Sequence, residues 1–212
     1  GHEDLVGRVL PGWDVVNDDS DPADDNGHGT HVAGIAAATT DNTTGVAGMA
    51  QAGILPVKVL ESWGSGSHSD IASGITWAVD HGAKVLNLSF GGIYSTLTLE
   101  SAVEYAYNHG VAIIASAGND SSSQPFYPAA YPECVSVSAT TATDERWPQS
   151  NFGSFIDLAA PGDSIWSTYW TVGDPTAAYA TMSGTSQSAP FVTGTVALML
   201  GLEPGLTVGN VY

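Results

Sequence analysis

The sequence is poor in cysteine, in basic residues and in long apolar runs. Its single cysteine, Cys134, cannot form a disulfide within the chain, and we interpret it as a small apolar side chain in a buried strand. Lys and Arg number 4 against 22 Asp and Glu, which gives a formal net charge of −18. Such a charge repels phosphate-rich surfaces, so we expect no nucleic acid and no membrane as a partner. No run approaches the roughly 20 apolar residues of a membrane-spanning helix.

Composition favours one folded domain over residues 1–212. Apolar residues make up 43% of the chain and charged residues only 12%, which argues against disorder driven by charge. Glycine occurs 25 times, which suits a fold with many tight turns. We find no internal repeat, linker or low-complexity tract, and 212 residues suffice for a substantial core.

Apolar patterns predict an α/β fold with a mainly parallel sheet. Four runs with little polar alternation predict buried strands: 53–60, 84–89, 111–116 and 134–139. Between them, 69–82 and 97–110 have helical spacing, and each ends in His-Gly, a helix stop. Strands buried on both sides imply helices on both faces of the sheet. In such sheets chemistry gathers at the carboxyl ends of the strands.

Three segments rich in Gly, Ser and Asn have candidate catalytic residues. The segment 183–190 opens the apolar run 191–202, so Ser186 is expected in the first turn of a helix, where free N–H groups can stabilise an oxyanion; a serine there can also be an ordinary N-cap. His28, between two glycines at a predicted helix start, can act as a general base, or be a buried histidine. A zinc site made by His28 and His31 is disfavoured, because such sites need a third protein ligand and no other His or Cys cluster in the sequence offers one. Asn119, at a strand end, can donate to a substrate oxygen or simply form a turn.

Together the three segments resemble the subtilisin-like serine proteases, and most of all their thermitase-like branch. His28 lies in His-Gly-Thr-His-Val-Ala-Gly, Asn119 in Ala-Gly-Asn and Ser186 in Gly-Thr-Ser-x-x-x-Pro, in the family's order and spacing. The resemblance implies the three-layer subtilisin-like fold, with Ser186 as nucleophile and His28 as general base. It also implies that Asn119 and the Ser186 N–H form the oxyanion hole.

The resemblance further implies a site that reads an extended polypeptide by its main chain. The implied substrate-binding residues are Ser89, Phe90 and Gly91 on one edge, Gly64, Ser65 and Gly66 on the other, and Ser116, Ala117, Gly118 and Phe126 beside them. Phe126 would make the main specificity pocket shallow. A cis peptide bond is implied at Tyr127-Pro128. Polypeptide substrates, secretion, a monomeric state and a propeptide in the precursor are also expected.

Two calcium sites are implied by the same resemblance. The first would use Asp14, Asn17, Asp19 and Asp21 of an acidic loop, and the second Asp4 and Asn42 with the carbonyls of Thr39, Thr44 and Val46. The alternative is a solvated acidic loop. Gln187 replaces the family's usual Met after the nucleophile, which predicts resistance to peroxide.

No aspartate of this sequence matches the triad aspartate of the family, which is expected upstream of Gly1; Asp4 matches a later segment. We therefore expect a chain truncated at both ends that is poorly folded and nearly inactive alone. The rival interpretation is a catalytically inactive relative that serves as a binding module. A nucleotide-binding enzyme and an α/β-hydrolase esterase are disfavoured, because their glycine motifs are missing.

Overall fold

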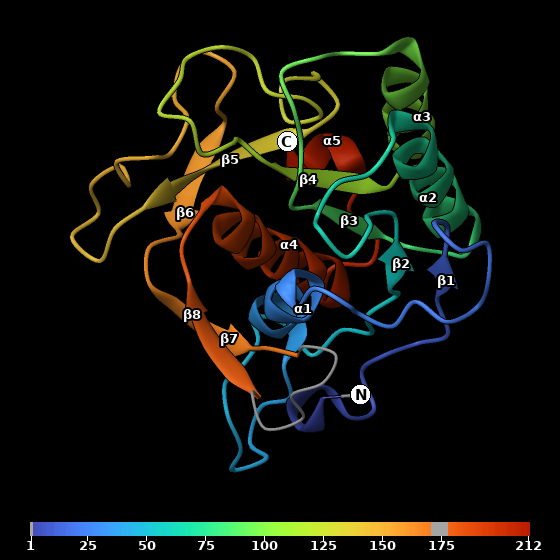
Figure 1. Ribbon diagram of the computed structural model, residues 1–212, viewed down its shortest axis with the longest axis vertical. Coiled ribbons are helices and arrows are strands. Elements are labelled where there is room, and N and C mark those ends of the chain that lie inside the picture. The colour runs from blue at the N-terminus through green and yellow to red at the C-terminus, as the bar shows by residue number, and fades with distance from the viewer. Residues whose placement is uncertain (1, 171–177) are drawn as a thin grey trace.

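The computed structural model describes residues 2–170 and 178–212, and its centre is a four-stranded parallel sheet (Figure 1). The strands are β3 (Val85–Leu88), β4 (Ala112–Ser116), β5 (Val135–Thr140) and β6 (Leu158–Pro161), in the order β3-β4-β5-β6. The predicted parallel sheet is thus present, and three of the four predicted strands form part of it.

Helices cover both faces of this sheet (Figure 1). On one face, α2 (His68–Asp80) and α3 (Leu97–Asn108) pack on a core that includes Ile113 of β4. On the other, α4 (Thr185–Leu202) packs on a second core that includes Ile114. Because neighbouring residues of a strand point to opposite faces, a strand buried on both sides is apolar throughout. The outer helix α1 (His28–Ala37) lies against α4 and completes the layers.

Two small sheets flank the main one. A parallel pair joins β1 (Trp13–Asp14) to β2 (Val57–Lys58), and an antiparallel pair joins β7 (Ile165–Thr168) to β8 (Tyr179–Met182). A short 3-10 helix, η1 (Glu3–Leu5), precedes them, and α5 (Val208–Val211) follows α4. Among the described helices, none has the length and apolar character needed to cross a bilayer.

The region 53–60 differs from its prediction. Only Val57–Lys58 forms a strand, with one further bridge between Ile54 and Val9. Pro56 interrupts the run because it has no N–H to donate to a sheet. The other predictions hold more closely: Cys134 is buried next to β5, and the Tyr127-Pro128 bond is cis. Burial raises the pKa of the Cys134 thiol, so this thiol stays protonated and unreactive.

Candidate active site

Ser186 is the second residue of α4, and it is bound to the segment that follows β3. Its hydroxyl donates to the carbonyl of Ser89 at 3.1 Å, and the Ser89 hydroxyl donates to the carbonyl of Ser186 at 2.8 Å. The two bonds fix the start of the helix at the carboxyl end of the sheet. In a first helical turn the N–H of Ser186 has no partner within the helix, so it is free to bind an anionic oxygen.

Pro190, inside α4, explains why the Ser186 carbonyl is available to Ser89. Proline has no N–H, so the carbonyl four residues earlier loses its usual helical partner. That carbonyl belongs to Ser186, and the Ser89 hydroxyl supplies the missing donor. The motif proline therefore joins the nucleophile's segment to β3 without leaving a buried oxygen unpaired.

Thr185, which directly precedes Ser186, binds the side chain of Asn119 and so holds it near Ser186. The Asn119 Oδ1 accepts from the Thr185 N–H at 2.9 Å and from the Thr185 hydroxyl at 3.0 Å. Because the oxygen of the amide is occupied, its Nδ2 remains as a donor. A Cβ added at Gly184 would lie 3.2 Å from that Nδ2, so the glycine leaves room beside the donor. The structure thus brings two of the three predicted catalytic residues together.

Asn151 was not foreseen from the sequence, and it holds the Asn119 segment in place. Its side chain is 1% exposed. The Nδ2 donates to the carbonyl of Ala117 at 2.9 Å, while Oδ1 accepts from the N–H groups of Asp120 and Ser122. One side chain therefore replaces sheet bonds that this loop lacks. A single asparagine outside any motif gives no sequence signal for this role.

His28 is the first residue of α1, and its ring is half-buried. Helices α1 and α4 are in close contact where Gly194 of α4 approaches the carbonyl of Ala36 of α1. Ala36 is eight residues after His28, and Gly194 is eight residues after Ser186. Among the described residues no hydrogen bond joins the His28 ring to Ser186, whose hydroxyl is bonded to Ser89. Catalytic bonds are often loose before substrate binds, so the pairing stays a prediction.

Burial lowers the pKa of His28, and the negative charge of Asp24 only partly opposes this. The imidazole is therefore neutral at neutral pH, the form that accepts a proton. Asp24 itself caps α1: its carboxylate accepts from the N–H groups of Asn26, Gly27 and Thr30 and from the Thr30 hydroxyl. With both oxygens so occupied, Asp24 is a capping residue rather than a carboxylate that orients the His28 ring.

His31 points toward the backbone of the small sheet β7–β8. It is fully buried, and its Nε2 lies 3.2 Å from the Ile165 carbonyl and 3.1 Å from the Ala180 carbonyl. These contacts tie α1 to the small sheet β7–β8. His31 is thus a buried histidine bonded to backbone carbonyls.

The predicted substrate-binding residues fall into two groups. In the first, the Phe126 ring lies between two backbones: a Cβ at Gly91 would be 2.4 Å from Phe126 Cε1, and one at Gly118 would be 3.0 Å from its Cδ2. Ser116 and Ala117 are buried, and Phe90 is half-buried and packs against the core under α2 and α3. In the second group, Gly64, Ser65 and Gly66 form a turn in which the Ser65 carbonyl accepts from the N–H of Glu61.

The predicted ligands around Asp4 form one cluster. The Asp4 side chain is fully buried, and its oxygens accept from Asn42 Nδ2 at 2.6 Å and from the Val46 N–H at 2.8 Å. The N–H of Thr39 donates to the Asp4 carbonyl, and the N–H of Thr44 donates to Asn42 Oδ1. Burial, and then the charges of Asp4 and Glu3, raise the pKa of Tyr179 to about 12, so the field here is negative.

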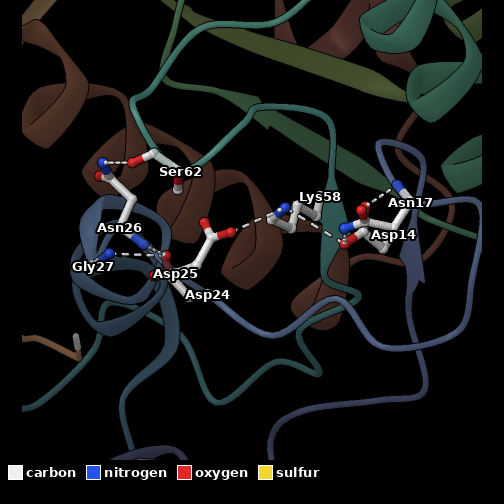
Figure 2. A network of polar contacts seen from close by, with 8 residues as sticks. All are labelled: Asp14, Asn17, Asp24, Asp25, Asn26, Gly27, Lys58 and Ser62. Atoms are coloured by element: carbon white, nitrogen blue, oxygen red, sulfur yellow. Dashed lines mark hydrogen bonds and ion pairs between the residues drawn. The ribbon is translucent and has the colours of Figure 1, made fainter. Parts of the chain in front are cut away.

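The acidic loop is arranged differently from the prediction. Asp14 accepts from the N–H and the Nδ2 of Asn17, while Asp19 Oδ1 accepts from the N–H of Asp21. Within residues 2–170 and 178–212 no group of three or more acidic, His or Cys side chains converges to hold a metal ion. The side chains named for this loop therefore do not fit a calcium ion as they stand, and Lys58 lies against Asp14 instead (Figure 2).

A family model described as the subtilase family matches residues 2–211. The chain belongs to the subtilase family. Thermitase of Thermoactinomyces vulgaris is 49% identical over 199 residues, which are 93% of this chain and 70% of thermitase. The thermophilic serine proteinase of Bacillus sp. strain AK1 is 50% identical over 199 residues, which are 93% of this chain and 48% of that protein. These names support the thermitase-like branch and a subtilisin-like serine endopeptidase as the enzyme class.

Solved structures confirm the predicted subtilisin-like α/β fold. A crystal structure of a cold-adapted subtilisin-like serine proteinase matches with a TM-score of 0.90 and 38% identity, over 100% of this chain and 74% of that one. Proteases from Pseudoalteromonas arctica PAMC 21717 match with a TM-score of 0.89 and 32% identity, over 99% and 77%. The chain thus spans about half of one relative and about three quarters of these structures.

Proposed function

We propose that the protein containing this chain is a serine endopeptidase with Ser186 as nucleophile, His28 as general base and Asn119 as oxyanion donor. The observation that carries the proposal is the junction of Ser186 and Asn119 through Thr185 at the start of α4. The junction holds the Asn119 amide at the same helix start that has the Ser186 hydroxyl and the N–H groups of the first turn. This is the set that an acyl transfer needs around the reacting carbonyl.

The reaction follows from these roles. The neutral imidazole of His28 removes the proton from Ser186 Oγ as that oxygen attacks the peptide carbonyl carbon. The carbonyl oxygen becomes negative and accepts from Asn119 Nδ2 and the Ser186 N–H. The protonated imidazole then donates to the leaving amine, and water releases the acyl group by the same steps in reverse. For attack, Ser186 Oγ must leave its bond to the Ser89 carbonyl, which substrate binding would displace.

The carboxylate that orients His28 is proposed to come from a segment upstream of Gly1. Among the described residues Asp24 is the acid that acts on His28, and it serves as a helix cap. The edge of β3 away from β4 has no strand partner within the described residues, which leaves room for a further strand. Reading the gene upstream for Asp-Thr-Gly or Asp-Ser-Gly tests this step; its absence there would favour an inactive relative.

The proposed substrate is an extended polypeptide with a modest side chain at the main specificity pocket. Support comes from the Phe126 ring, which fills the space between Gly91 and Gly118. Phe126→Gly should raise kcat/KM for substrates with bulky aromatic side chains relative to small ones. An unchanged preference would remove Phe126 from the pocket.

Calcium is proposed at the Asp4 cluster. The proposed ligands are the buried Asp4 carboxylate, the Asn42 amide oxygen and the carbonyls of Thr39, Thr44 and Val46, and calcium would replace the N–H groups that Asp4 and Asn42 Oδ1 now bind. When bound, calcium would supply the positive charge that the buried carboxylate lacks.

Secretion, a monomeric state and a propeptide in the precursor are proposed from the resemblance to the subtilase family. One relative, from Thermus sp. strain Rt41A, is named an extracellular serine proteinase.

Kinetics of single variants of the full-length gene product test the proposed activity. Ser186→Ala and His28→Ala should each lower kcat on a peptide substrate by several orders of magnitude, and Asn119→Ala by about 10²–10³-fold with KM little changed. Ser73→Ala, an exposed serine of α2, is the matched control. A full-length protein with the upstream aspartate but no turnover, or with turnover that survives Ser186→Ala, would contradict the proposal.

A further inference from the structure

The segment from Asp14 to Asp25 has a large excess of negative charge. It contains six aspartates and no basic residue, in a chain with only 4 Lys and Arg. Three of the four basic side chains lie elsewhere: Arg8 donates to the Gln51 side chain and carbonyl, Arg146 donates to backbone carbonyls, and Lys84 is exposed. The salt bridges within the described part of the chain both use the fourth, Lys58.

The backbone places Lys58 opposite Asp14. β1 and β2 are parallel, and their register pairs Asp14 with Lys58, so the two side chains lie on the same face. The Lys58 ammonium is 3.5 Å from Asp14 Oδ2 and 3.2 Å from Asp25 Oδ2 (Figure 2). The side chains of Lys58 and Asp14 are 10% and 3% exposed, so their charges are largely removed from water. One ammonium therefore joins the first aspartate of the segment to the last.

Several other carboxylate oxygens of the segment accept hydrogen bonds from its own backbone and amides or from the start of α1. Both Asp14 oxygens accept from Asn17, Asp19 accepts from the N–H of Asp21, and Asp24 accepts from the start of α1. A divalent ion prefers six to eight oxygen ligands around one point. Among residues 2–170 and 178–212, the positive group that lies within salt-bridge distance of two carboxylates is the Lys58 ammonium.

We propose that the Lys58 ammonium is the resident cation of the segment 14–25, in the place of a divalent ion, so that this segment folds without calcium. The segment leads into His28, and Lys58 fixes it at two points, one in β1 and one in the turn before α1. A charge carried by the chain itself cannot be removed by a chelator. The proposal concerns cation binding alone and does not depend on the proteolytic function.

Tb³⁺ luminescence tests the proposal on the full-length gene product. Tb³⁺ takes the oxygen ligands of calcium and emits when a nearby tryptophan is excited, and Trp13 directly precedes Asp14. The measured quantity is the saturable emission that disappears on Trp13→Phe, which separates this segment from the Asp4 cluster. We expect a clear saturable signal in Lys58→Met and none in the wild type, even at a Tb³⁺ concentration at least tenfold above that which half-saturates the variant.

Two matched variants serve as controls. Lys58→Arg keeps the cation and should resemble the wild type, and Lys84→Met removes an exposed lysine and should do the same. Saturable, Trp13-dependent binding in the wild type would overturn the proposal, and so would its absence from a folded Lys58→Met protein. If Lys58→Met is unfolded, calcium should restore its far-UV circular dichroism and NaCl of equal ionic strength should not; failure of calcium to do so would also overturn it.

Discussion

Asp4 and Asp14 are both buried carboxylates, yet their partners differ in charge. Asp4 accepts only from neutral donors, Asn42 and the Val46 N–H, and forms no salt bridge to any described residue. Asp14 has the neutral Asn17 and in addition the ammonium of Lys58. Because an uncompensated buried charge costs several kcal/mol, the two sites are not equivalent.

The difference shows how an acidic chain divides its few positive charges. With 4 basic residues against 22 acidic ones, the chain cannot give every carboxylate a positive partner of its own. Lys58 compensates Asp14 and Asp25, whereas Asp4 depends on a cation from solution under our proposal. The first region should therefore be insensitive to calcium and the second sensitive to it. Four experiments on the two regions test this contrast.

The largest effect is expected from Asp4→Asn, which keeps the shape of the side chain but removes its charge. The variant should lose the calcium-dependent part of the stability, about 4 kcal/mol when free calcium exceeds its Kd about a thousandfold. Thermal unfolding of the full-length protein with calcium or with a chelator measures this. Asp14→Asn is the control and should keep the calcium response; a wild-type Tm that ignores the chelator would contradict the comparison.

Lys58→Met should cost about 3 kcal/mol, because it leaves Asp14 buried without a positive partner. Denaturant unfolding at neutral pH measures the loss. In the double variant Asp14→Asn/Lys58→Met the cost should be clearly smaller than the sum of the two single changes, since neither charge is then left unpaired. Lys84→Met should stay within about 0.5 kcal/mol of the wild type. Additive single and double changes would mean that the ion pair contributes nothing.

The same pair should shape stability at both extremes of pH. Burial by itself raises the pKa of Asp14, but the bonds from Asn17 and the charge of Lys58 outweigh it and lower the pKa below 3.8. Burial by itself lowers the pKa of Lys58, but Asp25 and Asp14 raise it above 10.5. The stability that ionised Asp14 contributes is therefore complete above about pH 4 and is lost as pH falls through the pKa of Asp14 in the folded protein. The stability that protonated Lys58 contributes is complete below about pH 10 and is lost as pH rises through the pKa of Lys58 in the folded protein.

Unfolding free energies measured across pH check these signs. Asp14→Asn should flatten the acid side of the curve relative to the wild type, and Lys58→Met the alkaline side. Identical alkaline limbs in the wild type and Lys58→Met would show that the ammonium gains nothing from its partners.

Asp25→Asn should have the smallest effect, about 0.5 kcal/mol, because the Asp25 side chain is 35% exposed and water screens the pair. The loss should shrink further as NaCl is raised. Unfolding at low and high salt measures both. A cost equal to that of Lys58→Met would place the main partner of the ammonium at Asp25 rather than Asp14.

The sheet and the two helices on one face could be predicted because their signals are local. Val85–Leu88, Ala112–Ser116 and Val135–Thr140 are apolar runs, and α2 and α3 have regular helical spacing. β6, β7 and β8 were not predicted, since each is four residues long and partly exposed. Strands of that length form through their neighbours rather than through a pattern of their own.

In the candidate site, too, some residues could be predicted from local motifs and others could not. Motifs placed Ser186 and Asn119 at an α4 start and a strand end, and the structure brings them together. The roles of Thr185, Asn151 and Lys58 depend on contacts between residues distant in the sequence, and such contacts leave no local pattern. Under our proposal the cation that compensates the acidic loop lies on β2, outside the loop, so no pattern within the loop could indicate it.

A phosphonofluoridate reagent tests whether Ser186 is a nucleophile activated by His28. In the full-length protein we expect one covalent adduct per chain, located at Ser186 by peptide mass spectrometry, and no adduct in His28→Ala at the same exposure. Unmodified Ser186 in a folded, complete protein, or an adduct that forms equally fast without His28, would contradict it.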